Sequence, residues 1–134
     1  MRTSGARTYG IIAGLALAGF SLLASTTWAG QKKAEPVIIN TNSRYAQGSL
    51  ASARSSADVI QSIGCTIRES GVVTCSARNG ANTAALNCTA NDPGYRAAVQ
   101  SLNGDSRIYF SADAAGSCTS LVVDNSSAWA PKEP

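Results

Sequence analysis

The chain has 134 residues, with eleven lysines and arginines against eight acidic residues, a formal net charge of +3 and no histidine. The lack of histidine excludes Ser-His-Asp and Cys-His catalytic groups and removes the commonest transition-metal ligand. The basic residues stand singly except for Lys32 and Lys33. Nucleic-acid-binding proteins carry a basic face, so we expect no nucleic-acid partner.

The first 29 residues have the features of a secretory signal peptide. A basic start is followed by the apolar run 11–24, and Thr27 and Ala29 occupy positions −3 and −1 of a cleavage site. A membrane-spanning helix needs about 20 apolar residues, and this run is shorter. We therefore expect residues 1–29 to be cleaved on export to the periplasm or the extracellular medium, with no membrane partner afterwards. The oligomeric state stays open.

All four cysteines lie in the expected mature chain, at Cys65, Cys75, Cys88 and Cys118. An even number of cysteines in a small exported chain predicts two disulfides. Structural zinc sites usually use closely spaced Cys-x-x-Cys pairs, and the spacings here are ten, thirteen and thirty residues. We therefore expect disulfides, with no metal and no cofactor.

The mature chain is predicted to begin with an irregular segment. Residues 30–48 are interpreted as an N-terminal tail or linker, because Pro36 blocks a helix and 37–39 is the only apolar patch. Residues 49–57 fit a helix by the spacing of their apolar residues and an edge strand by their many serines. The structure of this second segment stays open.

Period-two alternation predicts three successive strands in a meander. Apolar residues alternate with polar ones over 63–67, 73–77 and 84–88, with turn residues between the runs. Folding the first run back on the second aligns the two apolar faces and places Cys65 opposite Cys75.

The period then changes to that of a helix. Asp92 is a good N-cap, Pro93 is tolerated in the first turn, and Asn103–Gly104 provides a C-terminal cap. Strands are predicted over 108–112 and 118–124. The predicted fold is a small α+β domain with a helix on one face of an antiparallel sheet: a three-stranded meander, one helix, then a two-stranded hairpin.

The domain is expected to span residues 49–125, followed by an extended C-terminal tail, 126–134.

Within this fold the disulfide pairing is constrained. If the three strands are neighbours in order, Cys65 and Cys88 flank the middle strand at about 9–10 Å. Bridged cysteines need Cα atoms within about 7 Å, so a 65–88 bond is excluded. Two pairings remain, 65–75 with 88–118 and 75–88 with 65–118; the hairpin register favours the first.

Paired carboxylates of the glycosidase kind are the one catalytic arrangement that the composition allows. Each acidic residue of the predicted domain has instead a structural explanation in a turn, at a helix start or beside a strand; they are Asp58, Glu69, Asp92, Asp105, Asp113 and Asp124. We therefore predict that the protein is not an enzyme. The oxygen-rich stretches 103–106 and 124–127 match no EF-hand loop and are typical of turns.

Two aromatic residues outside the predicted strands, Tyr45 and Trp129, are candidates for partner binding, because tyrosine and tryptophan are over-represented as anchors of interfaces. The alternative, which the ease of burying such rings favours, is that both cover the ends of the sheet.

The motifs IGC (63–65), NDP (91–93), IYFSAD (108–113) and DNSSAWAPK (124–132), with the spaced cysteines, resemble small exported proteins of Gram-negative bacteria. The resemblance implies bacterial export and carries no functional residue. Export, disulfides and the missing catalytic groups favour a binding module whose partner is an unidentified protein or envelope ligand. Two alternatives stay open: a structural subunit that assembles by strand addition through residues 37–39, and a small inhibitor of an extracellular hydrolase.

Overall fold

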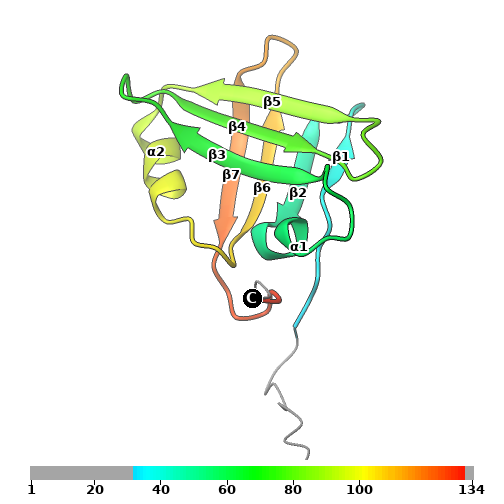
Figure 1. Cartoon of the computed structure of the whole chain (residues 1–134). Helices are drawn as coiled ribbons and strands as arrows, with labels where there is room; N and C mark the ends of the chain where they lie inside the picture. Colours follow the sequence, from blue (N-terminus) through cyan, green and yellow to red (C-terminus); the bar gives the residue numbers. More distant parts are fainter. Residues whose placement is uncertain (1–31, 132–134) are drawn as a thin grey trace, which may run out of the picture.

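The computed structural model describes residues 32–131, so the predicted signal peptide, 1–29, lies outside the described residues. The described chain forms seven strands and two helices: β1 (Ile38–Asn40), β2 (Tyr45–Ser49), α1 (Leu50–Arg54), β3 (Ser62–Ile67), β4 (Val73–Arg78), β5 (Ala85–Ala90), α2 (Pro93–Gln100), β6 (Arg107–Ala112) and β7 (Cys118–Asp124). The strands form two antiparallel sheets, with orders β1-β2-β6-β7 and β3-β4-β5. Figure 1 shows one sheet in front of the other, with their strands crossing.

The predicted α+β class is confirmed, and so is the meander. Strand β3 pairs with β4 in the expected register, in which Ile63 faces Ala77, Cys65 faces Cys75 and Ile67 faces Val73. The alternation that predicts these strands turns Val73, Cys75 and Ala77 toward the interior, where they are buried. The strands formed by residues 32–131 are divided between two sheets. The sequence pattern does not predict this division.

The N-terminal segment belongs to the fold. The prediction of a tail or linker over 30–48 is wrong for residues 38–48, because β1 and β2 pair with each other and β2 pairs with β6. Ala46 and Gly48 are the core-facing residues of β2. Their small size lets Val37 lie against the strand: a Cβ placed on Gly48 would be 3.1 Å from the Cα of Val37.

The two helices lie at the sides of the stacked sheets. Ser49 ends β2 and caps α1, since its Oγ accepts a hydrogen bond from the Ser52 N–H, and residues 50–54 are therefore helical. Asp92 caps α2 as predicted, by accepting from the Gly94 N–H. Helix α2 packs against β7 of one sheet and β3 and β4 of the other, rather than covering one sheet face as expected.

The hydrophobic core lies between the two sheets. Ile108 and Phe110 of β6 and Val73 of β4 are fully buried there, and Val99 adds one residue from α2. Burial of this apolar surface between two layers is the main source of stability in a domain of this kind.

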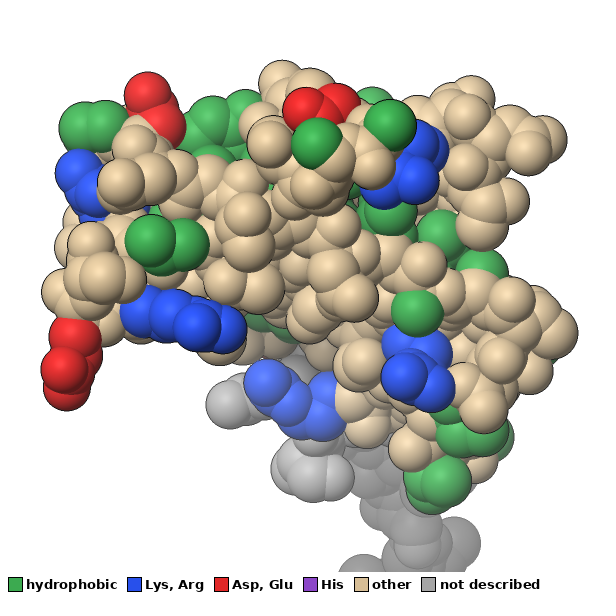
Figure 2. Space-filling model, turned by 90° about the horizontal axis from the view of Figure 1, so that it is seen from above, with side chains coloured by type: hydrophobic (Ala, Val, Ile, Leu, Met, Phe, Trp, Pro, Cys, Tyr) green, Lys and Arg blue, Asp and Glu red, His purple; other side chains and the backbone are tan. Residues whose placement is uncertain are grey.

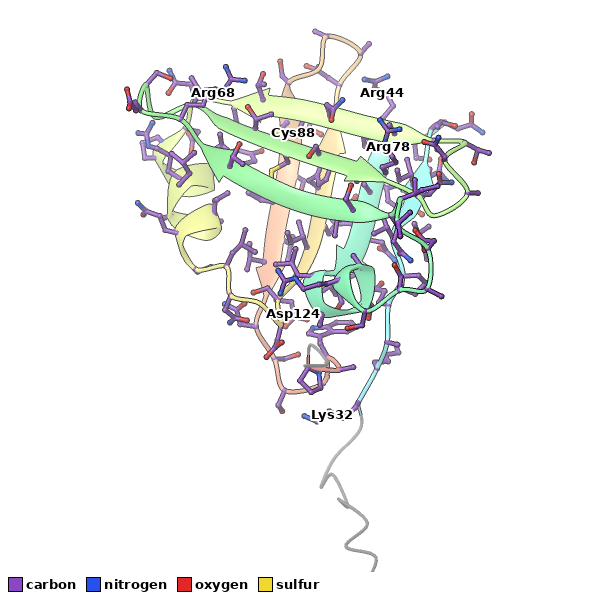
Figure 3. The ribbon with its side chains drawn as sticks, viewed as in Figure 1. Lys32, Arg44, Arg68, Arg78, Cys88 and Asp124 are labelled. Atoms are coloured by element: carbon purple, nitrogen blue, oxygen red, sulfur yellow. A yellow bond between two sulfur atoms is a disulfide. The ribbon has the colours of Figure 1, made fainter. Side chains whose placement is uncertain are left out.

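The preferred disulfide pairing is confirmed. Cys65 bonds to Cys75 within the three-stranded sheet, and Cys88 bonds to Cys118, which joins β5 to β7 of the other sheet. Figure 3 labels Cys88 on the three-stranded sheet, where this sheet crosses β7. Over residues 32–131, no helix is long and apolar enough to cross a bilayer.

Candidate functional site

The outer face of the four-stranded sheet carries the candidate site. Along β6, Ile108, Phe110 and Ala112 are buried, whereas Arg107 and Tyr109 alternate with them and are only half-buried. Because successive side chains of a strand point to opposite faces, these two residues lie on the face turned away from the core. The site is built on paired strands, which hold its side chains in fixed positions.

Tyr45 and Tyr109 form a stacked pair on this face. Their ring centroids are 5.6 Å apart and the ring planes differ by 28°. The pairing of β2 with β6 places Tyr109 opposite Gln47, so Tyr45, two residues before Gln47, is its diagonal neighbour. Antiparallel register therefore brings together two aromatic rings that are distant in sequence.

Arg107 is held at the other end of the same face by a network of polar contacts. Its Nε and Nη2 atoms donate to the two carboxylate oxygens of Glu35, and Nη2 also donates to Gln47 Oε1 at 3.1 Å. Gln47 Nε2 in turn donates to Glu35 Oε1 at 2.9 Å. The side chains of Arg107 and Glu35 are only 19% and 15% exposed, so the ion pair is partly shielded from solvent.

Trp129 completes the arrangement from the C-terminal segment. The Arg107 guanidinium carbon lies 5.2 Å from the centroid of the Trp129 ring, within the range of a cation–π contact. Trp129 is placed there by a short parallel bridge to Lys33, in which the Lys33 N–H donates to Ala128 O at 2.8 Å. The set Tyr45, Tyr109, Arg107 and Trp129 is called the aromatic row below.

The structure places Tyr45 on this sheet face and Trp129 against Arg107, at the end of the sheet where β6 begins. Tyr45 stacks on Tyr109 at one end of the aromatic row, and Trp129 lies against Arg107 at the other. Sequence reasoning missed Tyr109 and Arg107. The alternation in strand 107–112 could have identified them. They occupy the positions between the apolar residues, which point to the outer face when the apolar residues point inward.

Two exposed apolar side chains flank the aromatic row on the same face. Ile38 of β1 pairs with Gln47 and is 45% exposed, and Val122 of β7 pairs with Tyr109 and is 47% exposed. Directly opposite residues in an antiparallel sheet share a face. The face therefore combines aromatic, aliphatic and arginine side chains.

Asp124 lies beside Arg107 at the edge of this face, as its register partner on β7. The pKa of Asp124 is lowered, mainly because its carboxylate accepts a hydrogen bond from the Ser126 N–H, and further by the nearby Trp129 indole and the Arg107 charge. The Trp129 Nε1 atom is buried, and it meets no acceptor at full hydrogen-bond geometry. The indole therefore acts on Asp124 electrostatically rather than through a formed hydrogen bond.

A shallow depression of about 360 Å³ adjoins the Trp129 end of the row. The two oxygen-rich stretches of the sequence meet there, joined by the contact of Ser106 Oγ with Asn125 Oδ1. Asn103 and Asp124 each accept an N–H from two residues further along the chain, the pattern expected of Asx turns.

The charged side chains do not gather on the face seen in Figure 2, where lysines and arginines are separated by polar and backbone atoms. Figure 3 places Arg68 apart from Arg44 and Arg78, while Lys32 and Asp124 lie toward the other end of the molecule. Among these, Arg44 donates to Asp113 O at 2.8 Å, which holds it against the turn that follows β6.

Comparisons of the chain with protein-family models, curated proteins and solved structures find no match.

Proposed function

We propose that the chain is an exported, non-catalytic binding module that recognises a protein partner at the cell envelope or outside the cell. The observation that carries the proposal is the aromatic row, in which Tyr45 and Tyr109 stack at one end and Arg107 and Trp129 meet at the other. Its location on an outer sheet face supports access by a partner.

The composition of the face supports a protein as the partner. Tyrosine, tryptophan and arginine are the residues most enriched at interface hot spots, and interface centres are depleted in lysine and glutamate. Exposed Ile38 and Val122 add apolar surface beside the row. Glu35 offsets the charge of Arg107, and a near-neutral face of this kind suits another protein surface.

The face is also held in one conformation before binding. Arg107 is restrained by Glu35, Gln47 and Trp129 together, so little side-chain freedom remains to be lost on association. Preorganisation of this kind improves affinity by lowering the entropic cost of binding. The two disulfides are compatible with an oxidising compartment, which supports the export half of the proposal.

Site-specific photo-crosslinking in producing cells tests the proposal. The photoreactive analogue p-benzoylphenylalanine replaces Tyr45, and in a matched control it replaces Asn87, which is exposed on the outer face of the other sheet. We expect an adduct with a second protein from position 45 and none from position 87. We also expect to recover the chain from the cell envelope or the medium. Mass spectrometry then identifies the partner. The purified double variant Y45A/Y109A should no longer bind that partner.

Four outcomes would redirect the function. Equal adducts from positions 45 and 87 would overturn the assignment of the face. An adduct only between copies of the chain would favour the structural alternative, for which β1 is suited as the edge strand of its sheet. A hydrolase as the sole partner, inhibited by the pure protein, would favour the inhibitor. Release of a product from a sugar polymer or ester by the pure protein would contradict a non-catalytic role.

A further inference from the structure

The two disulfides lie side by side. The Sγ atoms of Cys75, Cys88 and Cys118 are all within 4.8 Å of one another, although Cys75 belongs to one disulfide and the other two form the second. The cause is the register of the three-stranded sheet, in which Cys75 of β4 is opposite Cys65 on one side and Cys88 on the other.

The strand geometry allows a bond between Cys75 and Cys88. Each residue of a central antiparallel strand forms a narrow pair with one neighbour and a wide pair with the other. Cys75 forms the narrow pair with Cys65, at a Cα–Cα distance of 4.0 Å. Its pair with Cys88 is then the wide one, at about 5.5 Å, which lies within the range that disulfides bridge.

Burial divides the four cysteines into an inner and an outer pair. Cys75 and Cys88 are 0% and 1% exposed, whereas Cys65 and Cys118 are half-buried. A thiolate arriving from solvent therefore reaches Cys65 or Cys118, and the sulfur that it displaces belongs to the inner pair.

We propose that the protein carries out thiol–disulfide exchange with an external dithiol, through an internal transfer from one disulfide to the other. One thiolate of the dithiol attacks Cys65 Sγ, the Cys65–Cys75 bond breaks, and Cys75 leaves as a thiolate. This thiolate attacks Cys88 Sγ, which forms the Cys75–Cys88 bond, breaks the Cys88–Cys118 bond and releases Cys118 as a thiolate.

The second thiol of the reductant then attacks the mixed disulfide at its own sulfur, and Cys65 leaves as a thiolate that takes up a proton. The dithiol is oxidised to its disulfide by two electrons, and the protein goes from two disulfides to one disulfide and two thiols. Attack at Cys118 instead releases Cys88, which attacks Cys75 Sγ and displaces Cys65. Both routes end in the same product.

The exchange changes how the two sheets are connected. The Cys88–Cys118 bond joins the sheets, whereas a Cys75–Cys88 bond lies within one of them. The product therefore lacks the covalent link between β5 and β7 and carries thiols at its two half-buried cysteines.

The decisive experiment compares the variants Cys65→Ser and Cys75→Ser, which remove the same disulfide. Cys65→Ser leaves Cys75 as a thiol beside the Cys88–Cys118 bond. Cys75→Ser leaves Cys65, whose sulfur does not belong to the group of three neighbouring sulfur atoms. After incubation without reductant at pH 8 and an acid quench, we expect Cys65→Ser to contain both Cys88–Cys118 and Cys75–Cys88 bonds. Cys75→Ser should retain Cys88–Cys118 alone.

Tryptic mapping can assign every bond, because Arg68, Arg78 and Arg96 separate the four cysteines into different peptides. A measurement on the unaltered protein does not depend on the folding of a variant: one equivalent of dithiothreitol is added, and the thiols are alkylated after the quench. We expect labels on Cys65 and Cys118 with a Cys75–Cys88 bond. Labels confined to the pair of one original disulfide would overturn the proposal, as would an unchanged Cys88–Cys118 bond in Cys65→Ser.

Discussion

Arg107 lies over the ring of Trp129, with its guanidinium carbon 5.2 Å from the ring centroid, and the same guanidinium donates to Glu35. One side chain of β6 therefore holds two segments that precede and follow the sheets in the sequence. Residues 32–35 and 128–131 also pair directly, through Lys33 and Trp129. The N-terminal segment is part of the folded unit because this end of the sheet gives it polar partners.

The ion pair of Glu35 with Arg107 leads to a stability prediction. The substitution E35Q keeps an acceptor for Arg107 but removes the opposite charge at a site where both side chains are mostly shielded. We expect the free energy of unfolding to fall by about 1–2 kcal/mol, measured by urea denaturation. The matched control is E69Q, which makes the same change at an exposed residue in the turn between β3 and β4. Equal losses in the two variants would refute a specific role for the pair.

Asp124 leads to a prediction about pH. Its pKa is lowered in the folded protein, with the Trp129 indole among the causes. A carboxyl with a lowered folded pKa contributes stability that is present above its unfolded pKa and is lost as the pH falls through the folded value. In W129F we expect the pKa of Asp124 to move up toward its ordinary value, so this contribution to stability becomes smaller and its loss on acidification is complete at a higher pH.

Carbon-detected NMR titration of the Asp124 carboxyl measures the effect directly. The backbone N–H of Ser126 is the largest cause of the shift and is retained in the variant, so part of the depression should persist. An identical titration of Asp124 in the two proteins would mean that the indole does not act on this carboxyl.

The sequence predicts best the strands with strong apolar contrast. The β3–β4 hairpin and the disulfide between Cys65 and Cys75 follow from alternation and turn residues alone, because strand register is a local property there. Strand β2 was missed because its core-facing residues are Ala46 and Gly48, which give almost no hydrophobic signal. The stacking of Tyr45 on Tyr109 depends on a pairing between distant strands, which local periodicity cannot reveal.

The close approach of Gly48 to Val37 predicts that replacement by alanine destabilises the protein at Gly48 but not at Gly64, another strand glycine. In G48A the new Cβ would lie 3.1 Å from Val37 Cα and 3.2 Å from Val37 Cγ2, so we expect a loss of about 1–2 kcal/mol in unfolding free energy. In the control G64A nothing lies within 4 Å of the new Cβ, and we expect no loss of stability. Thermal unfolding of the two variants distinguishes these effects. Retained stability in G48A would show that the N-terminal segment can move away from β2 without cost.

The two disulfides should contribute unequally to stability because they close loops of different length. Cys88–Cys118 spans 30 residues and joins the two sheets, whereas Cys65–Cys75 spans 10 residues within one hairpin. The loss of chain entropy in the unfolded state predicts a stabilisation of about 3.6 kcal/mol for the first bond and about 2.7 kcal/mol for the second. Both estimates are large fractions of the stability of a small domain, so each bond should be needed for full resistance to denaturant.

Urea denaturation of the double variants C88A/C118A and C65A/C75A tests this order. Each variant replaces one fully buried and one half-buried cysteine, so the apolar surface lost is similar and the comparison isolates the cross-link. We expect the lower midpoint for C88A/C118A. Within residues 32–131, the bond removed is the only disulfide that joins the two sheets, from β5 to β7. If C65A/C75A were instead the less stable, the short hairpin would be the part of the domain that depends most on its cross-link, and the sheets would be held together mainly by the packing of Phe110 and its neighbours.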